Sequence, residues 1–159
     1  MIDLTPYQDP HLIQAALACR RIAVVGLSLN VLRASHFVGY YLTRHGYDVV
    51  PVNPREASIF GLHCYPELTA IPGGVDLVDV FREPAAVPDI ARQAVASGAK
   101  FLWLQYDVIS PEGIAIAEAG GMKVIVDRCI KIEHARYFGR MYVLGFNTGV
   151  ISAKRNFST

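Results

Sequence analysis

Polar and basic side chains follow several short apolar runs of this sequence, a pattern that could bind a phosphorylated ligand. The first run ends in Gly26, and the residues after it supply hydroxyl, amide and guanidinium groups from Ser28, Asn30, Arg33 and Ser35. A glycine at a strand-to-helix turn lets backbone N–H groups approach a phosphate, and the helix N-terminus favours negative charge. Because only Gly26 matches the GxGxxG dinucleotide fingerprint, an ordinary turn with Ser35 as a helix cap is the alternative.

The second apolar run ends in Asn53, Pro54 and Arg55. An NAD-binding domain usually has an acidic residue here to accept hydrogen bonds from the ribose, but this chain has no carboxylate before Glu56. The planar guanidinium of Arg55 could instead bind two oxygens of a ribose phosphate. Both NADP and coenzyme A carry such a phosphate, so the position favours either over plain NAD. An exposed arginine after a proline turn is the alternative.

The three further apolar runs end in residues that indicate a ligand site less strongly. Phe81 could lie against an adenine and Arg82 could supply charge to a diphosphate, although a core position for Phe81 is an equal alternative. Gln105 could hydrogen-bond an amide-bearing ligand arm, whereas Trp103 is typical of a core residue. Cys129 precedes a predicted helix, where the pKa of a thiol can be lowered. A buried, unreactive cysteine is the favoured interpretation.

The elements that would position these groups are strands alternating with helices. The apolar runs are mostly apolar on consecutive positions, as in strands covered on both faces, and span 21–26, 47–52, 75–81, 100–105 and 122–127. Capping residues, prolines and helical spacing predict helices over 10–17, 35–44, 84–98, 110–120 and 130–138. A turn and a short helix are expected over 61–71, and an edge strand or partner contact over 142–145.

Right-handed crossovers then predict a doubly wound, Rossmann-like α/β fold with a five-stranded parallel sheet and helices on both faces. The expected strand order is 3-2-1-4-5 or 2-1-3-4-5. Ligands of such sheets bind at the carboxyl ends of the strands, where the strand order reverses. The polar strand ends described above are therefore the candidate site.

Length and composition predict a single domain over 1–159, with its core over 10–138 and a C-terminal extension over 139–159. The formal net charge of +1 gives no electrostatic footprint for nucleic acid or an anionic membrane. No apolar stretch approaches the ~20 residues of a membrane span, and the N-terminus lacks the pattern of a signal peptide. Three separated cysteines without a CxxC pair favour a reduced, cytoplasmic setting. The apolar stretch 137–151 leaves a homodimer open.

Five segments occur in a characteristic order: IAVVGLS (22–28), PVNPR (51–55), DVFR (79–82), LWLQ (102–105) and DRCIKIEH (127–134). In this combination they resemble the stand-alone CoA-binding proteins of bacteria and archaea, a family similar to the N-terminal CoA-binding domain of the succinyl-CoA synthetase alpha subunit. The resemblance covers about residues 10–138. One departure is Asn30-Val31, where the family loop usually continues Asn-Pro.

The resemblance implies coenzyme A as the ligand, with its phosphates over the loop 26–33. It places the second strand end at the adenosine phosphate, the third and fourth along the ligand toward the pantetheine arm, and the fifth near the far end of that arm. The implied binding residues are Gly26, Leu27, Ser28, Asn30, Arg33, Ser35, Asn53, Pro54, Arg55, Val80, Phe81, Arg82, Gln105, Asp127, Arg128 and Cys129.

No catalytic or metal-binding constellation is recognisable beside these residues. The sequence has no HExxH, GxSxG or Walker motif, and His134 is expected to pair structurally with Glu133. In the synthetase, the phosphorylated histidine lies outside the nucleotide-binding domain. We therefore predict a non-catalytic binder of coenzyme A or an acyl-CoA, serving as a sensor or partner subunit. An NADP-binding oxidoreductase-like domain and a scaffold without tight ligand binding are the alternatives.

Overall fold

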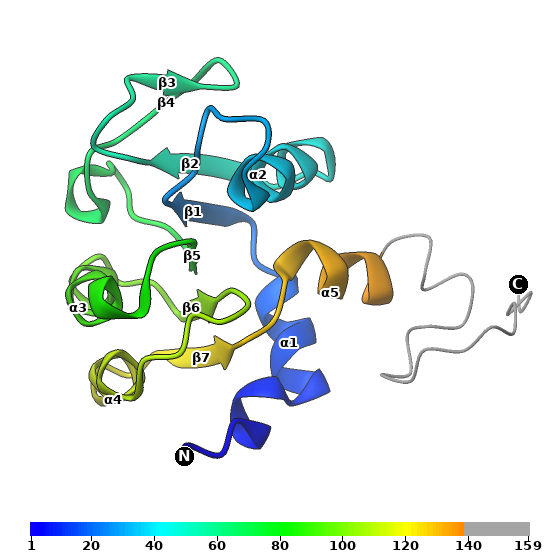
Figure 1. Cartoon of the computed structure of the whole chain (residues 1–159), viewed down its shortest axis with the longest axis vertical. Helices are drawn as coiled ribbons and strands as arrows, with labels where there is room; N and C mark the ends of the chain where they lie inside the picture. Colours follow the sequence, from blue (N-terminus) through cyan, green and yellow to red (C-terminus); the bar gives the residue numbers. More distant parts are fainter. Residues whose placement is uncertain (139–159) are drawn as a thin grey trace, which may run out of the picture.

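Parallel strands form the central layer of the structure, a computed structural model that describes residues 1–138 (Figure 1). The strands of this sheet are β1 (Arg21–Val25), β2 (Asp48–Val52), β5 (Leu77–Val80), β6 (Phe101–Leu104) and β7 (Lys123–Val126). Their order is β2-β1-β5-β6-β7, and every neighbouring pair is parallel. In chain order this is 2-1-3-4-5, so the second of the two expected orders is confirmed. The strand order reverses at β1, because β2 lies on one side of β1 and the next strand of this sheet along the chain, β5, lies on its other side.

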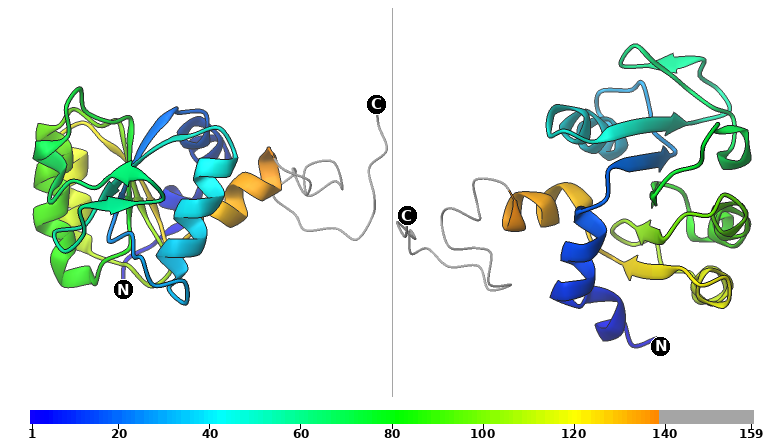
Figure 2. Two further views of the ribbon diagram at one scale, coloured as in Figure 1. Left: turned by 90° about the horizontal axis from the view of Figure 1, so that it is seen from above. Right: turned by 180° about the vertical axis from the view of Figure 1, so that it is seen from behind.

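Helices cover both faces of the sheet, as the doubly wound fold requires (Figure 2, left). One core contains residues of α3 (Val87–Ala96) and α4 (Pro111–Ala119) with one face of the strands. The other core contains residues of α1 (Pro10–Leu17), α2 (Ala34–Arg44) and α5 (Ile130–Tyr137) with the opposite face. Each strand is therefore buried on both sides, which explains its consecutive apolar residues. No helix within residues 1–138 has the length and hydropathy to cross a membrane.

Two helix starts show how the sequence fixes these elements locally. Asp9 caps α1, because its side chain accepts a hydrogen bond from the backbone N–H of Leu12 at 3.0 Å. Ser110 caps α4 in the same way, with its hydroxyl accepting from the N–H of Gly113 at 3.1 Å. A proline follows each cap at the first turn, where its missing N–H costs nothing. Both starts confirm the sequence prediction.

The segment between β2 and β5 departs from the prediction of a turn and one short helix. The short helix is present as a 3-10 turn, η2 (Leu68–Ala70), but β3 (Ser58–Ile59) and β4 (Leu62–His63) add an antiparallel hairpin. Phe60 and Gly61 form its tip with φ of 56° and 73°. Two-residue strands carry too short a pattern to be recognised in a sequence. A 3-10 turn at η1 (Thr5–Gln8) was also not predicted, whereas η3 (Pro84–Ala86) is the first turn of the helix predicted over 84–98. The expected strand or partner contact over 142–145 lies outside the described residues.

Candidate functional site

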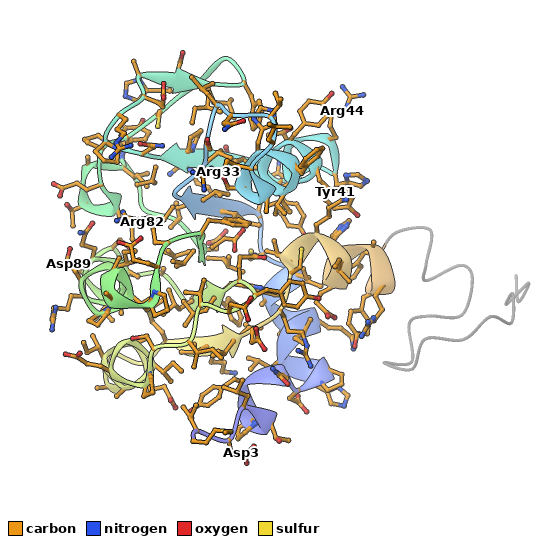
Figure 3. The ribbon with its side chains drawn as sticks, viewed as in Figure 1. Asp3, Arg33, Tyr41, Arg44, Arg82 and Asp89 are labelled. Atoms are coloured by element: carbon orange, nitrogen blue, oxygen red, sulfur yellow. The ribbon has the colours of Figure 1, made fainter. Side chains whose placement is uncertain are left out.

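A cleft of about 850 Å³ opens at the carboxyl ends of β1, β2 and β5, where the strand order reverses. Figure 3 shows Arg33, Arg82 and Asp89 along the side of the molecule toward which β1 and β2 point. Nine of the sequence-predicted residues line it: Gly26, Ser28, Arg33, Ser35, Asn53, Pro54, Arg55, Phe81 and Arg82. The structure thus gathers the first three strand ends around one cavity. A crevice at this point is where open α/β sheets bind ligands.

Gly26 joins three strands at the floor of the cleft. Its N–H donates to the carbonyl of Val52 at 2.9 Å, and its φ is 86°. A Cβ at this position would lie 2.4 Å from the carbonyl oxygen of Phe81 and 3.2 Å from Cδ of Arg82. The sequence pattern predicts that this glycine lets the backbone approach a phosphate. The structure shows that the fold also needs it, because the chain leaving β5 crosses directly over its Cα.

The loop after Gly26 is fixed by its own polar side chains. The N–H of Ser28 donates to Ser35 Oγ at 3.1 Å, and the N–H of Asn30 donates to Ser28 Oγ at 3.0 Å. Asn30 Oδ1 in turn accepts from the N–H of Leu32 at 3.0 Å, which holds the loop although position 31 is a valine and not a proline. The alternative role of Ser35 as helix cap is wrong, since Arg33 occupies the N-cap position of α2.

Leu27 and Asn53 connect the first two strand ends. The side chain of Leu27 is fully buried, so only its backbone could reach a ligand. Its carbonyl accepts from Asn53 Nδ2 at 3.0 Å, and Asn53 Oδ1 accepts from the N–H of Arg55 at 2.9 Å. Asn53 therefore holds the segment that carries Arg55 against the glycine loop. Its amide is a positioning group, with both ends already bonded within the protein.

Three guanidinium groups from separate strand ends line the cleft: those of Arg33, Arg55 and Arg82. Within residues 1–138, Arg33 and Arg55 make no salt bridge, whereas Arg82 pairs with Glu83. Hydrogen bonds from Arg82 hold the pKa of the Glu83 carboxyl below its usual range. Three positive side chains beside a glycine turn and a helix N-terminus can bind several phosphate oxygens.

The wall of the cleft that η2 and α3 form is not predicted by the sequence. It carries the polar side chains of Glu67, Asp89 and Gln93, whereas its Leu68 and Ile90 side chains are buried. Gln93 joins its two segments, since Nε2 donates to Asp89 Oδ2 at 3.0 Å and Oε1 accepts from the N–H of Leu68 at 3.1 Å. The i,i+4 spacing of Asp89 and Gln93 predicts that these side chains meet on one helix face. Nothing in the sequence indicates that this face borders the cleft.

The fourth strand end contacts a buried carboxyl of β5, and its role at a ligand arm stays a prediction. Gln105 is 4% exposed and does not line the cleft; its Nε2 donates to Asp79 Oδ1. Burial raises the pKa of Asp79 to about 8. The amide nitrogen assigned to a ligand arm is thus bonded to a buried carboxyl. Val80 is also fully buried and could offer a ligand only its backbone, while Trp103 is fully buried, as expected.

The fifth strand end is occupied by internal hydrogen bonds. Asp127 has a φ of 59° and accepts from the N–H of Asp107 at 2.8 Å. Arg128 donates through Nη1 to the carbonyl of Asp127 and through Nη2 to Gln8 Oε1, both at 2.9 Å. Burial raises the pKa of the half-buried Cys129 thiol, so the alternative of a lowered pKa is wrong, and an unreactive thiol stays a prediction. None of these three predicted residues lines the cleft.

The expected pairing of Glu133 with His134 is wrong. Adjacent residues of a helix point in different directions, so they do not face each other. Tyr41 Oη lies 2.8 Å from His134 Nδ1. The Glu133 carboxylate instead pairs with two arginines, with Oε1 3.9 Å from Arg128 Nε and Oε2 3.8 Å from Arg136 Nη1. Burial lowers the pKa of His134. In the described part of the chain, no group of three His, Cys, Asp or Glu residues is arranged to hold a metal ion.

Comparisons with known proteins place the chain in a family. The model of a family described as "CoA binding domain" matches residues 20–135. The chain is 36% identical over 116 residues to the uncharacterized protein YneT of Bacillus subtilis (strain 168), covering 73% of this chain and 86% of that protein. A solved structure of a hypothetical protein from Pyrococcus horikoshii OT3 superposes with a TM-score of 0.81 at 34% identity, covering 86% of this chain and 96% of that one.

A longer enzyme matches through only one part of its length. The chain is 28% identical over 143 residues to the ADP-forming acetate–CoA ligase II of Archaeoglobus fulgidus. This match covers 88% of the present chain but 20% of the ligase. The chain is therefore similar to one module of that ligase, whereas it spans most of the other two relatives.

Proposed function

Because the chain belongs to the CoA binding domain family, we propose that its cleft binds coenzyme A or an acyl-CoA, as a non-catalytic binding protein that serves as a sensor or partner subunit. The observation that carries the proposal is the set of three arginines around the Gly26 turn. Coenzyme A combines a diphosphate with a ribose 3′-phosphate. A cleft that binds it needs positive groups at two places, beside an apolar surface for the base.

The residues present fit such a ligand. Arg33 and Arg82 flank the Gly26 turn, which suits them to the diphosphate, and Arg55 stands at the end of β2, where a ribose phosphate would lie. Glu56 is half-buried and does not line the cleft, so no carboxylate at this strand end opposes the phosphate. Pro54, Pro66 and the half-buried Phe81 supply an apolar surface for an adenine.

The proposal of binding without catalysis rests on which parts of the relatives match. This chain aligns with 96% of the Pyrococcus protein and with 86% of YneT, and neither name describes an enzyme. The acetate–CoA ligase aligns through 20% of its length, so its reaction can depend on regions outside the match. We propose that this chain corresponds to the nucleotide-binding part of the ligase and does not carry out the ligase reaction.

Calorimetric titration with coenzyme A, dephospho-CoA, NADP and NAD tests the function. Coenzyme A should bind most tightly, with dephospho-CoA weaker because it lacks the 3′-phosphate that Arg55 is proposed to hold. Native mass spectrometry of freshly purified protein should detect any cofactor that remains bound. Tighter binding of NADP than of coenzyme A would instead support the oxidoreductase-like alternative. No binding of any of the four ligands would support a scaffold that has lost its ligand.

A further inference from the structure

Arg82, one of the three arginines of the cleft, already contacts an anion of the protein itself. Its Nε and Nη2 donate to Glu83 Oε2 and Oε1 at 3.2 and 3.0 Å. The side chain begins beside the Gly26 turn, because Cδ lies 3.2 Å from where a Cβ on Gly26 would be. Both Arg82 and Glu83 line the cleft. A carboxylate therefore occupies two donors of a guanidinium that stands at the glycine turn.

We propose that Glu83 is a built-in competitor for Arg82, which lowers the affinity of the cleft for anionic ligands and so sets how tightly coenzyme A is held. This inference rests on the proposed function, in which Arg82 binds the diphosphate. Carboxylate and phosphate groups use the same paired donors of a guanidinium. A diphosphate that engages Nε and Nη2 of Arg82 must first displace the Glu83 carboxylate.

The surroundings of the pair determine the size of the effect. The side chains of Arg82 and Glu83 are 40% and 61% exposed, so water can replace either partner and the exchange is readily reversible. Arg33 and Arg55 have no comparable competitor, since neither makes a salt bridge within residues 1–138. Glu83 thus modulates one of three positive groups. Exposed ion pairs of this kind contribute little, which corresponds to about a two- to fivefold change in affinity.

A double-mutant cycle tests the competition. The variants are Glu83→Gln, Arg82→Gln and the double variant, titrated with coenzyme A and separately with inorganic diphosphate at one salt concentration. Glu83→Gln should strengthen the binding of both ligands about two- to fivefold. The gain should disappear when Arg82 is already Gln, because the guanidinium that Glu83 occupies is then absent.

Glu67→Gln is the matched control. Glu67 lines the same cleft and loses the same charge, but it makes no salt bridge within the described residues. Two results would overturn the inference: a gain in affinity from Glu67→Gln equal to that from Glu83→Gln, or a gain from Glu83→Gln that persists when Arg82 is Gln. Either would show that the affinity depends on the net charge of the cleft and not on competition for Arg82.

The two ligands separate this inference from the proposed function. If coenzyme A fails to bind while diphosphate follows the expected cycle, the function is wrong and the competition stands. If coenzyme A binds and the cycle shows no coupling, the competition is wrong and the function stands. Failure of both ligands to bind any variant would contradict both.

Discussion

Two sets of strand ends in this molecule look alike in sequence and differ in the structure. The ends of β1, β2 and β5 surround a cleft, and Arg33 and Arg55 remain without ion pairs among the described residues. At the ends of β6 and β7, Gln105 and Arg128 bond to other parts of the protein. A polar residue after a strand therefore indicates a site only where its hydrogen-bonding groups remain available to a ligand.

The physical origin of this difference is the strand order. β1 lies between β2 and β5, so the connections from β1 and β5 lead to helices on opposite faces and separate above the sheet. No such reversal occurs between β5, β6 and β7. There the indole of Trp103 donates to the carbonyl of Arg128 at 2.8 Å, and the adjoining segments pack together. We call the carboxyl ends of β1, β2 and β5 the open half of this edge of the sheet, and those of β6 and β7 the filled half.

The largest expected effect concerns the glycine on which the open half depends. Gly26→Ala should lower the free energy of unfolding by about 2–5 kcal/mol, from the cost of a side chain at positive φ and from contact with the Phe81 carbonyl. Gly46→Ala is the control, because Gly46 has a similar φ of 87° and no heavy atom within 4 Å of its added Cβ. Urea denaturation measures both. Equal losses would show that the crossing of the chain over Gly26 has no energetic consequence.

The buried carboxyl of Asp79 in β5, which Gln105 of the filled half contacts, should make stability depend on pH. The pKa of Asp79 is raised from 3.8 to about 8, so the protonated form is favoured by folding. Its contribution is complete below pH 3.8 and is lost as the pH rises to about 8. Between pH 5 and pH 9, Asp79→Asn should therefore gain about 4 kcal/mol of unfolding free energy relative to the natural protein. An unchanged difference at the two pH values, measured by urea denaturation, would contradict the burial of an ionisable group there.

Substitution of two arginines, one from each half, should affect different properties: ligand binding for Arg55 and stability for Arg128. Arg55→Ala should weaken coenzyme A by about 1.5–3 kcal/mol, the range for a charged hydrogen bond, with little effect on dephospho-CoA or on thermal stability. Arg128→Ala should instead lower stability by about 1–3 kcal/mol, because Gln8 and the adjacent carbonyl lose their donor. Calorimetry and thermal denaturation of both variants distinguish the two roles. Equal weakening of both ligands by Arg55→Ala would show that this residue does not hold the ribose phosphate.

The smallest expected effect concerns Cys129. Because burial raises the pKa of its thiol, little thiolate is present at pH 8. Iodoacetamide should therefore modify the Cys129 thiol several-fold more slowly than it modifies the thiol of free glutathione. Mass spectrometry of a Cys19→Ser, Cys64→Ser variant would follow this one thiol among the cysteines of the chain. Modification as fast as that of glutathione would mean that the end of β7 is open, and the contrast between the two halves would weaken.

The sequence alone determined the layered α/β fold, because apolar runs on consecutive positions require cover on both faces of a strand. It also placed Gly26, Arg33 and Arg55 at strand ends, and its combined motifs resembled the family to which the chain belongs. It did not determine which of the two strand orders would form. That order decides which strand ends lie side by side.

Only the tertiary structure decided which polar groups face the cleft. Gln105 and Asp79 pair from neighbouring strands across 26 positions of sequence, and Arg128 reaches Gln8 across 120. Asp89 and Gln93 border the cleft because α3 packs beside η2, a contact that no local pattern encodes. Secondary structure follows from local periodicity, whereas the availability of a side chain depends on partners that are distant in the chain.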